Sequence, residues 1–97
     1  MFSLANAKGE DMKLLLVHGS GGCHLSFYYQ TRYFRDSDAV DLPGHPEGKP
    51  CTSIEENVEW LRQYINDRGY QDVILGGHSM GGAVALFYGL KYPEELK

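Results

Sequence analysis

The sequence of 97 residues lacks the features that mark several classes of protein. It has no cluster of lysine and arginine, and its formal net charge is −4, so we expect no nucleic-acid partner. Its uninterrupted apolar runs, such as Leu14 to Val17, are far shorter than the about 20 residues of a membrane-spanning helix. The N-terminal residues carry neither the basic nor the apolar segment of a secretory signal.

Cysteine is also scarce, since Cys23 and Cys51 are the only two in the chain. Their positions follow no metal-binding spacing, and nothing marks the chain for export, so we expect two reduced thiols in a cytoplasmic protein. The glycine-rich segments lack the lysine of a phosphate-binding loop. We therefore expect neither a metal ion nor an organic cofactor.

Three short apolar runs predict the strands of a parallel sheet. Residues 12–17 form a run that is apolar except for Lys13 and that ends at a glycine-rich segment, which is typical of a strand buried on both faces. Residues 38–42 and 72–76 predict two more strands, and a segment with helical features follows each of the three. This alternation predicts an α/β fold, and the length fits one domain or a piece of one.

The helix after residue 53 has the clearest signals. Ser53 and Glu56 form a capping box, and Gly69 is a C-terminal stop. Between them one apolar stripe recurs at intervals of four, three and four, formed by Ile54, Val58, Leu61 and Ile65.

Two other helices are predicted with weaker patterns. Residues 23–34 are aromatic but loosely spaced, and we expect Phe27, Tyr28 and Tyr29 to lie in the core and in a pocket wall. The last helix ends at Pro93, and its apolar face is expected to consist of Ala83, Val84, Leu86, Phe87 and Leu90.

The segment Gly77-His78-Ser79-Met80-Gly81 lies where the third strand meets the last helix. In a Gly-x-Ser-x-Gly turn the glycines leave room for a strained backbone that raises the serine hydroxyl above the end of the strand. The same turn directs the N–H of the next residue, Met80, toward the position where an oxyanion forms. The motif is short, and its place between a strand and a helix is what makes it informative.

Two more segments follow strands at the same edge of the predicted sheet. The first, His18-Gly19-Ser20-Gly21-Gly22, can supply a second oxyanion donor, the Ser20 N–H. Loss of one such donor typically costs about 3 kcal/mol of transition-state stabilisation. In the second segment, Asp41 to His45, we expect Asp41 to cap its own loop rather than to act in catalysis.

The segments VHGSGG, DLPGHP and GGHSMGG, in this order, resemble the N-terminal half of an α/β-hydrolase-fold serine hydrolase. Small esterases and lipases with an HG-x-G oxyanion loop are the most similar. The resemblance extends from about residue 12 to residue 97. It implies a three-layer αβα fold, of which about three strands and three helices are present, with the strand at Leu14 to Val17 in the middle of the three.

The resemblance also implies a set of site residues. Ser79 would be the nucleophile, and Met80 and Ser20 would donate backbone N–H groups to the oxyanion. The residues that would shape the site are His18, Gly19, Gly77, His78 and Gly81.

No histidine follows Ser79, whereas the family order is serine, then an acid, then histidine. We therefore expect the triad acid and base outside residues 1–97, which would be the N-terminal portion of a single α/β-hydrolase domain. The remainder of that domain, or a second chain, would supply them. Among the internal histidines, His18 and His78 have structural interpretations, while His24 and His45 stay open as substitute bases.

The leading functional hypothesis is a serine hydrolase that cleaves carboxylic esters of small or medium acyl groups through a covalent acyl-serine. Thioesterase, amidase, lactonase, acyltransferase and lyase chemistry use the same groups and stay open. The alternative is a non-catalytic module that binds a small molecule or a partner protein, or an inactive fragment. Because the edge of the last strand lacks an outer neighbour, we also expect the isolated chain to be poorly soluble or oligomeric.

Overall fold

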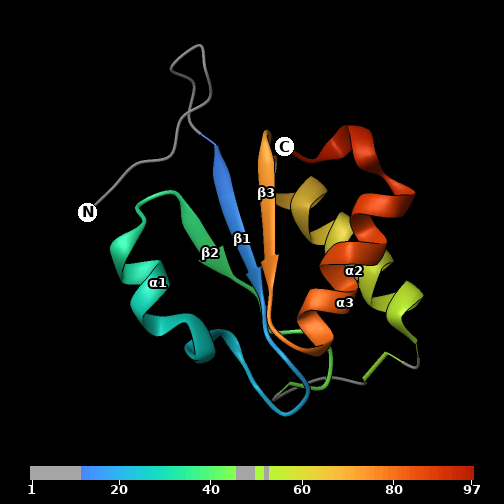
Figure 1. The fold of residues 1–97 in the computed structure, drawn as a ribbon, viewed down its shortest axis with the longest axis horizontal. Helices are drawn as coiled ribbons and strands as arrows, with labels where there is room; N and C mark the ends of the chain where they lie inside the picture. The colour runs from blue at the N-terminus through green and yellow to red at the C-terminus, as the bar shows by residue number, and fades with distance from the viewer. Residues whose placement is uncertain (1–11, 46–49, 52) are drawn as a thin grey trace.

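The computed structural model describes residues 12–45, 50–51 and 53–97. Its sheet consists of the parallel strands β1 (Lys13–Val17), β2 (Ser37–Ala39) and β3 (Val73–Gly77), in the order β2-β1-β3 (Figure 1). The register places Leu15 of β1 between Asp38 and Leu75. The predicted parallel sheet, with the first strand in the middle, is confirmed.

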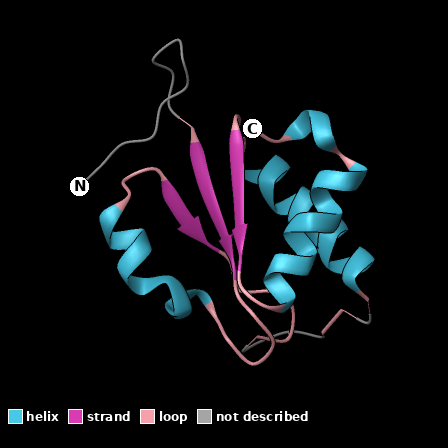
Figure 2. Ribbon diagram, viewed as in Figure 1, coloured by secondary structure: helices cyan, strands magenta, loops and turns pink. Residues whose placement is uncertain are grey.

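Helices cover both faces of the sheet. The 3₁₀ helix η1 (His24–Phe27) and α1 (Tyr28–Tyr33) connect β1 to β2, whereas α2 (Ile54–Arg68) connects β2 to β3. These two connections run across the sheet in opposite directions, so right-handed crossovers place their helices on opposite faces. Figure 2 shows this arrangement, with α1 on one side and α2 and the last helix, α3 (Met80–Lys91), on the other. The three-layer α/β architecture is therefore confirmed.

The main core lies between the sheet and α2 and α3. Val58, Leu61 and Ile65, from the predicted stripe of α2, are buried in it together with residues of the strands. The Ser53 hydroxyl accepts a hydrogen bond from the Glu56 N–H at 3.1 Å, and Gly69 ends α2 with a left-handed φ of 67°. Capping, periodicity and termination thus agree for this helix, as the sequence predicts. None of the described helices combines the length and hydropathy needed to cross a bilayer.

The aromatic segment before β2 differs from its prediction. Neither η1 nor α1 contains a buried residue, and Tyr29 is 80% exposed. Phe27, Tyr28 and Tyr29 are consecutive, so successive side chains of a helix point in different directions and cannot share one face. The expected aromatic core is therefore wrong for this segment.

The predicted face of α3 is also partly wrong. Val84 and Tyr88 face the core, whereas three of the expected core residues are exposed: Leu86 (61%), Phe87 (48%) and Leu90 (70%). Because α3 is apolar on nearly all sides, hydrophobicity alone does not identify its inner face. Tyr88 is held inward by its hydroxyl, which donates to Glu95 at 2.9 Å in the 3₁₀ helix η2 (Pro93–Glu95).

We predict that the exposed apolar face of α3 drives self-association of the chain. Replacing Leu86 and Leu90 together by glutamate should convert oligomers into monomers, because like charges on that face prevent its burial. Sedimentation velocity at about 100 μM measures the change, in the range where exposed apolar surfaces associate. Leu25→Glu, at an exposed position on η1, is the matched control and should leave the oligomers intact. A monomeric unmodified chain would contradict the prediction.

Candidate active site

Ser79 links β3 to α3 in a strained backbone conformation. Its φ of 56° and ψ of −118° fall in a region that residues with a side chain rarely adopt, at a typical cost of about 1–3 kcal/mol. Although Ser79 occupies the N-cap position of α3, its hydroxyl makes no capping hydrogen bond. Ser79 is therefore exposed where β3 ends and α3 begins, at the carboxyl edge of the sheet.

Two glycines make this turn possible. A Cβ atom on Gly81 would lie 2.0 Å from the carbonyl oxygen of Val17, and one on Gly77 would lie 2.2 Å from the carbonyl oxygen of Gly81. The His78 N–H also donates to the Val17 oxygen at 3.1 Å. The start of α3 is thus in direct backbone contact with the end of β1, and only glycine fits at these two positions.

The glycine-rich loop after β1 lies beside Ser79. A Cβ atom on Gly19 would lie 3.1 Å from the Cβ atom of Ser79. Residues 19–22 and 78–79, together with Ser26 of η1, line an open pocket of about 300 Å³. Ser26 was not predicted, because nothing in its sequence context distinguishes it from other surface serines.

Two backbone donors are free near this pocket. Within the described part of the chain, neither the Ser20 N–H nor the Met80 N–H donates to a backbone acceptor. Ser20 lines the pocket, and Met80 is the first residue of α3, where helical N–H groups have no partner within the helix. The helix dipole adds partial positive charge at the same end.

His18 connects two segments of the site from a buried position. The Leu42 N–H donates to its Nε2 atom at 3.1 Å, so Nε2 accepts and the hydrogen is on Nδ1. Nδ1 then donates to the Gly19 carbonyl oxygen at 2.7 Å. This ring therefore ties the glycine-rich loop to the segment after β2. It also explains why β2 ends at Ala39 instead of extending to residue 42, since the Leu42 N–H bonds to the ring rather than to a strand.

The other histidines do not reach the Ser79 hydroxyl. Among the described residues, no histidine ring forms a hydrogen bond with Ser79. The His78 ring lies against the glycine-rich loop after β1, with Nδ1 3.5 Å from the position of a Gly19 Cβ atom. His45 packs on His18 with ring centroids 5.0 Å apart. Among the described residues, no histidine is therefore placed to act as a base on Ser79.

Asp41 bonds to the His24 residue of η1 rather than capping its own loop. Its carboxylate accepts from the His24 backbone N–H at 2.7 Å and from the ring at 2.9 Å. Burial raises the pKa of Asp41, but the hydrogen bonds and charge of His24 together lower it by more. The pKa of Asp41 therefore lies below its ordinary value. The expected capping role is wrong, because the chain brings η1 within reach of the carboxylate.

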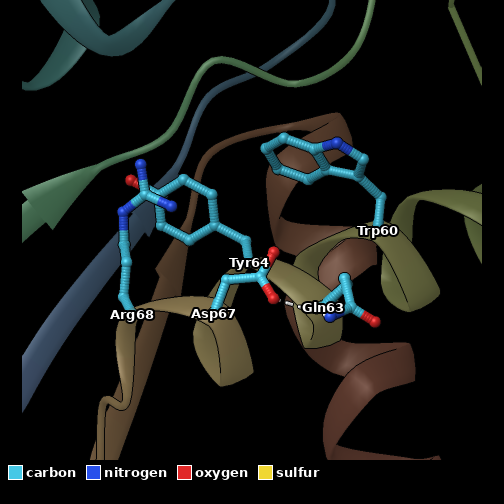
Figure 3. Close-up of a pocket in the computed structure, with 5 residues that line it drawn as sticks. All are labelled: Trp60, Gln63, Tyr64, Asp67 and Arg68. Carbon is cyan, nitrogen blue, oxygen red and sulfur yellow. Dashed lines mark hydrogen bonds between the residues drawn. The ribbon is translucent and has the colours of Figure 1, made fainter.

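A second hollow, of about 330 Å³, lies along one side of α2 and is lined by Trp60, Gln63, Tyr64, Asp67 and Arg68 (Figure 3). The Arg68 guanidinium covers the Tyr64 ring at 3.6 Å, and Gln63 donates to Asp67 at 2.7 Å. The Tyr64 hydroxyl donates to Asp38 of β2 at 2.6 Å, so these polar groups already have partners within the protein. All of its lining residues come from one helix and none is a nucleophile, so the Ser79 pocket is the better candidate site.

Comparison with known proteins agrees with this geometry. A sequence profile of the Alpha/beta hydrolase family matches residues 14–93, and the chain belongs to this family. Lipase 1 of Psychrobacter immobilis is 32% identical over 95% of this chain and 31% of the lipase. A proline iminopeptidase of Saccharolobus solfataricus is also 32% identical, over 99% of this chain and 34% of the peptidase.

Solved structures match over a comparable share of this chain, at lower sequence identity. A marine microorganism esterase has a TM-score of 0.76 at 23% identity, over 91% of this chain and 36% of the esterase. The type II thioesterase BorB has a TM-score of 0.71 at 25% identity, over 93% of this chain and 38% of the thioesterase. The α/β-hydrolase fold is therefore confirmed, and the chain spans about a third of the length of these relatives.

We predict that Gly81→Ala destabilises the fold by at least about 3 kcal/mol, because the new methyl group meets the backbone of β1. Gly82→Ala is the matched control. Its methyl group would lie 3.5 Å from the nearest atom, so helix propensity should stabilise the protein by about 0.5–1 kcal/mol. Urea denaturation followed by circular dichroism measures both. Equal stability of the two variants would show that the contact with β1 is not tight.

His18→Leu should cost roughly 1–3 kcal/mol of unfolding free energy, because it leaves the Leu42 N–H unpaired in a buried position, whereas the Gly19 carbonyl still accepts from the Gly22 N–H at 3.0 Å. His24→Leu, which removes only an exposed side-chain hydrogen bond to Asp41, should cost less than about 1 kcal/mol. The same denaturation measurement applies. Similar losses in the two variants would contradict the connecting role of His18.

Proposed function

We propose that Ser79 is the nucleophile of a serine hydrolase that cleaves carboxylic esters of small or medium acyl groups. The observation that carries this proposal is the positive φ of Ser79, which holds an uncapped, exposed hydroxyl beside a glycine-rich loop. Such strain persists only where the surrounding structure imposes it, and the backbone contact between Gly81 and Val17 does so here.

In the proposed reaction, the Ser79 oxygen attacks the ester carbonyl carbon while a base takes the hydroxyl proton. The carbonyl oxygen becomes an oxyanion, which accepts hydrogen bonds from the Ser20 and Met80 N–H groups. The intermediate then expels the alcohol, which receives the proton from the base, and an acyl-serine remains. Water, deprotonated by the same base, releases the acid and restores the serine.

We propose that the acid and base of the triad come from outside residues 1–97, in the remainder of a single hydrolase domain or in a second chain. Two observations support this. No described histidine bonds to Ser79, and the relatives are about three times as long as this chain. The exposed face of α3, formed by Leu86, Phe87 and Leu90, is the surface that such a segment would cover.

The similar lipase and esterase support an ester substrate, whereas the similar peptidase and thioesterase keep amide and thioester chemistry as alternatives. A non-catalytic module that binds a small molecule or partner protein is the main competitor. It has no need of a strained serine turn, and this disfavours it. The cytoplasmic location and the absence of a nucleic-acid partner stay predictions.

We predict that a fluorophosphonate probe labels Ser79 covalently in the polypeptide made from its uninterrupted reading frame. Ser79→Ala should abolish both the labelling and the hydrolysis of p-nitrophenyl butyrate, because no other described serine lies in a strained turn. Intact mass spectrometry with peptide mapping identifies the labelled residue. The control Ser37→Ala removes a hydroxyl that bonds to the Phe34 carbonyl, outside the pocket, and should retain labelling.

The outcomes separate the candidate functions. Labelling with ester turnover supports the serine hydrolase. Labelling with turnover of amides or thioesters alone retains the nucleophile and changes the substrate class. A folded protein that binds small esters but shows neither labelling nor turnover is a binding module, and the proposed function is then wrong.

A further inference from the structure

Three potential metal ligands meet beside the candidate active site. One ligand atom from each of Cys23, His24 and Asp41 lies within 4.8 Å of the other two. Cys23 and His24 lie at the start of η1, whereas Asp41 follows β2. The parallel pairing of β1 and β2 brings these two segments together at the carboxyl edge of the sheet.

The Asp41 and His24 side chains are already in contact with each other. The Asp41 carboxylate is fixed by the His24 backbone N–H at 2.7 Å, and both of its oxygens lie 2.9 Å from Nδ1 of the His24 ring. Both side chains are substantially exposed, at 50% for His24 and 40% for Asp41, so a hydrated ion can reach them. Cys23 is a free thiol at the N-cap of η1 and is partly exposed.

We propose that Cys23, His24 and Asp41 bind a divalent cation that accepts sulfur, nitrogen and oxygen ligands, and specifically Zn²⁺. Three protein ligands with a water molecule in the fourth position form a common four-coordinate zinc arrangement. Bond lengths of about 2.0–2.3 Å place tetrahedral ligands about 3.5 Å apart, so the 4.8 Å cluster must contract by roughly 1 Å. Rotation of exposed side chains supplies this movement.

Binding exchanges protons for the metal. The Cys23 thiol releases its proton to solvent and binds as a thiolate. Coordination at the ring nitrogen that faces Asp41 replaces the hydrogen bond between the two side chains by one bond from each to the ion. The freed imidazole hydrogen is carried on the other ring nitrogen, and the ligands together carry two negative charges against the two positive charges of the ion.

The site adjoins the Ser79 pocket without sharing its residues. Gly22 and Ser26, which flank Cys23 and His24 in the chain, line that pocket. A bound ion would therefore fix η1 to the segment after β2 and make one rim of the pocket rigid. This inference does not depend on the proposed hydrolase activity. It differs from the expectation of no metal, which rested on the lack of a metal-binding spacing in the sequence. Asp41 is 17 residues from His24, so the sequence does not show that the two side chains meet.

The test is a titration of the full reduced chain with Zn²⁺ by isothermal titration calorimetry, and with Co²⁺ by absorption spectroscopy. We expect one ion per chain and a thiolate-to-cobalt charge-transfer band. Cys23→Ser should remove that band, and Cys23→Ser, His24→Gln and Asp41→Asn should each weaken Zn²⁺ binding by roughly 10-fold to 100-fold. Circular dichroism verifies that each variant is folded, and the exposed His24 gives a variant with little structural cost.

Cys51→Ser and His45→Gln are matched controls, since each removes one potential ligand from outside the cluster, and both should bind Zn²⁺ like the unmodified chain. Zn²⁺ should also raise the melting temperature of the unmodified chain more than that of Cys23→Ser at the same concentration. The proposal is overturned if no saturable binding occurs up to about 100 μM Zn²⁺. It is equally overturned if Cys51→Ser weakens binding as much as Cys23→Ser, or if one ion binds per two chains.

Discussion

The start of α3 lies against the end of β1, and the arrangement of the site depends on this backbone contact. Gly81 approaches the Val17 carbonyl so closely that any side chain would collide with it, and the resulting tight turn forces Ser79 to a positive φ. Strain of about 1–3 kcal/mol at Ser79 is maintained because the sheet, α3 and the glycine-rich loop all meet there. The exposed hydroxyl is therefore a consequence of how a helix joins a sheet.

Polar contacts then order the loops around that hydroxyl. The buried His18 ring accepts from the segment after β2 and donates to the loop after β1, while Asp41 holds the start of η1. Because parallel strands end at the same edge, their loops meet there, and such an edge is where α/β proteins commonly bind ligands. These contacts gather the serine, two unpaired backbone donors and a pocket in one place, which fits the membership of the chain in the Alpha/beta hydrolase family.

Much of this fold could be predicted from local signals in the sequence. The cap at Ser53, the stop at Gly69 and the stripe of α2 are short-range patterns, and the structure bears them out. The orientation of α3 was not predictable, because an almost entirely apolar helix has no preferred face in its own sequence, and it is fixed by contacts with distant segments such as that of Gly81 with β1 and that of Tyr88 with Glu95. The partner of Asp41 was likewise hidden, since it depends on strand pairing between distant segments.

The most direct measurement of the proposed oxyanion site is a crystal structure of the phosphonate adduct of Ser79. We expect the phosphonyl oxygen to lie about 2.7–3.1 Å from both the Ser20 and the Met80 backbone nitrogen atoms. An adduct whose oxygen points into solvent, or bonds to only one of these nitrogen atoms, would contradict the assignment of the glycine-rich loop and the start of α3 as an oxyanion site.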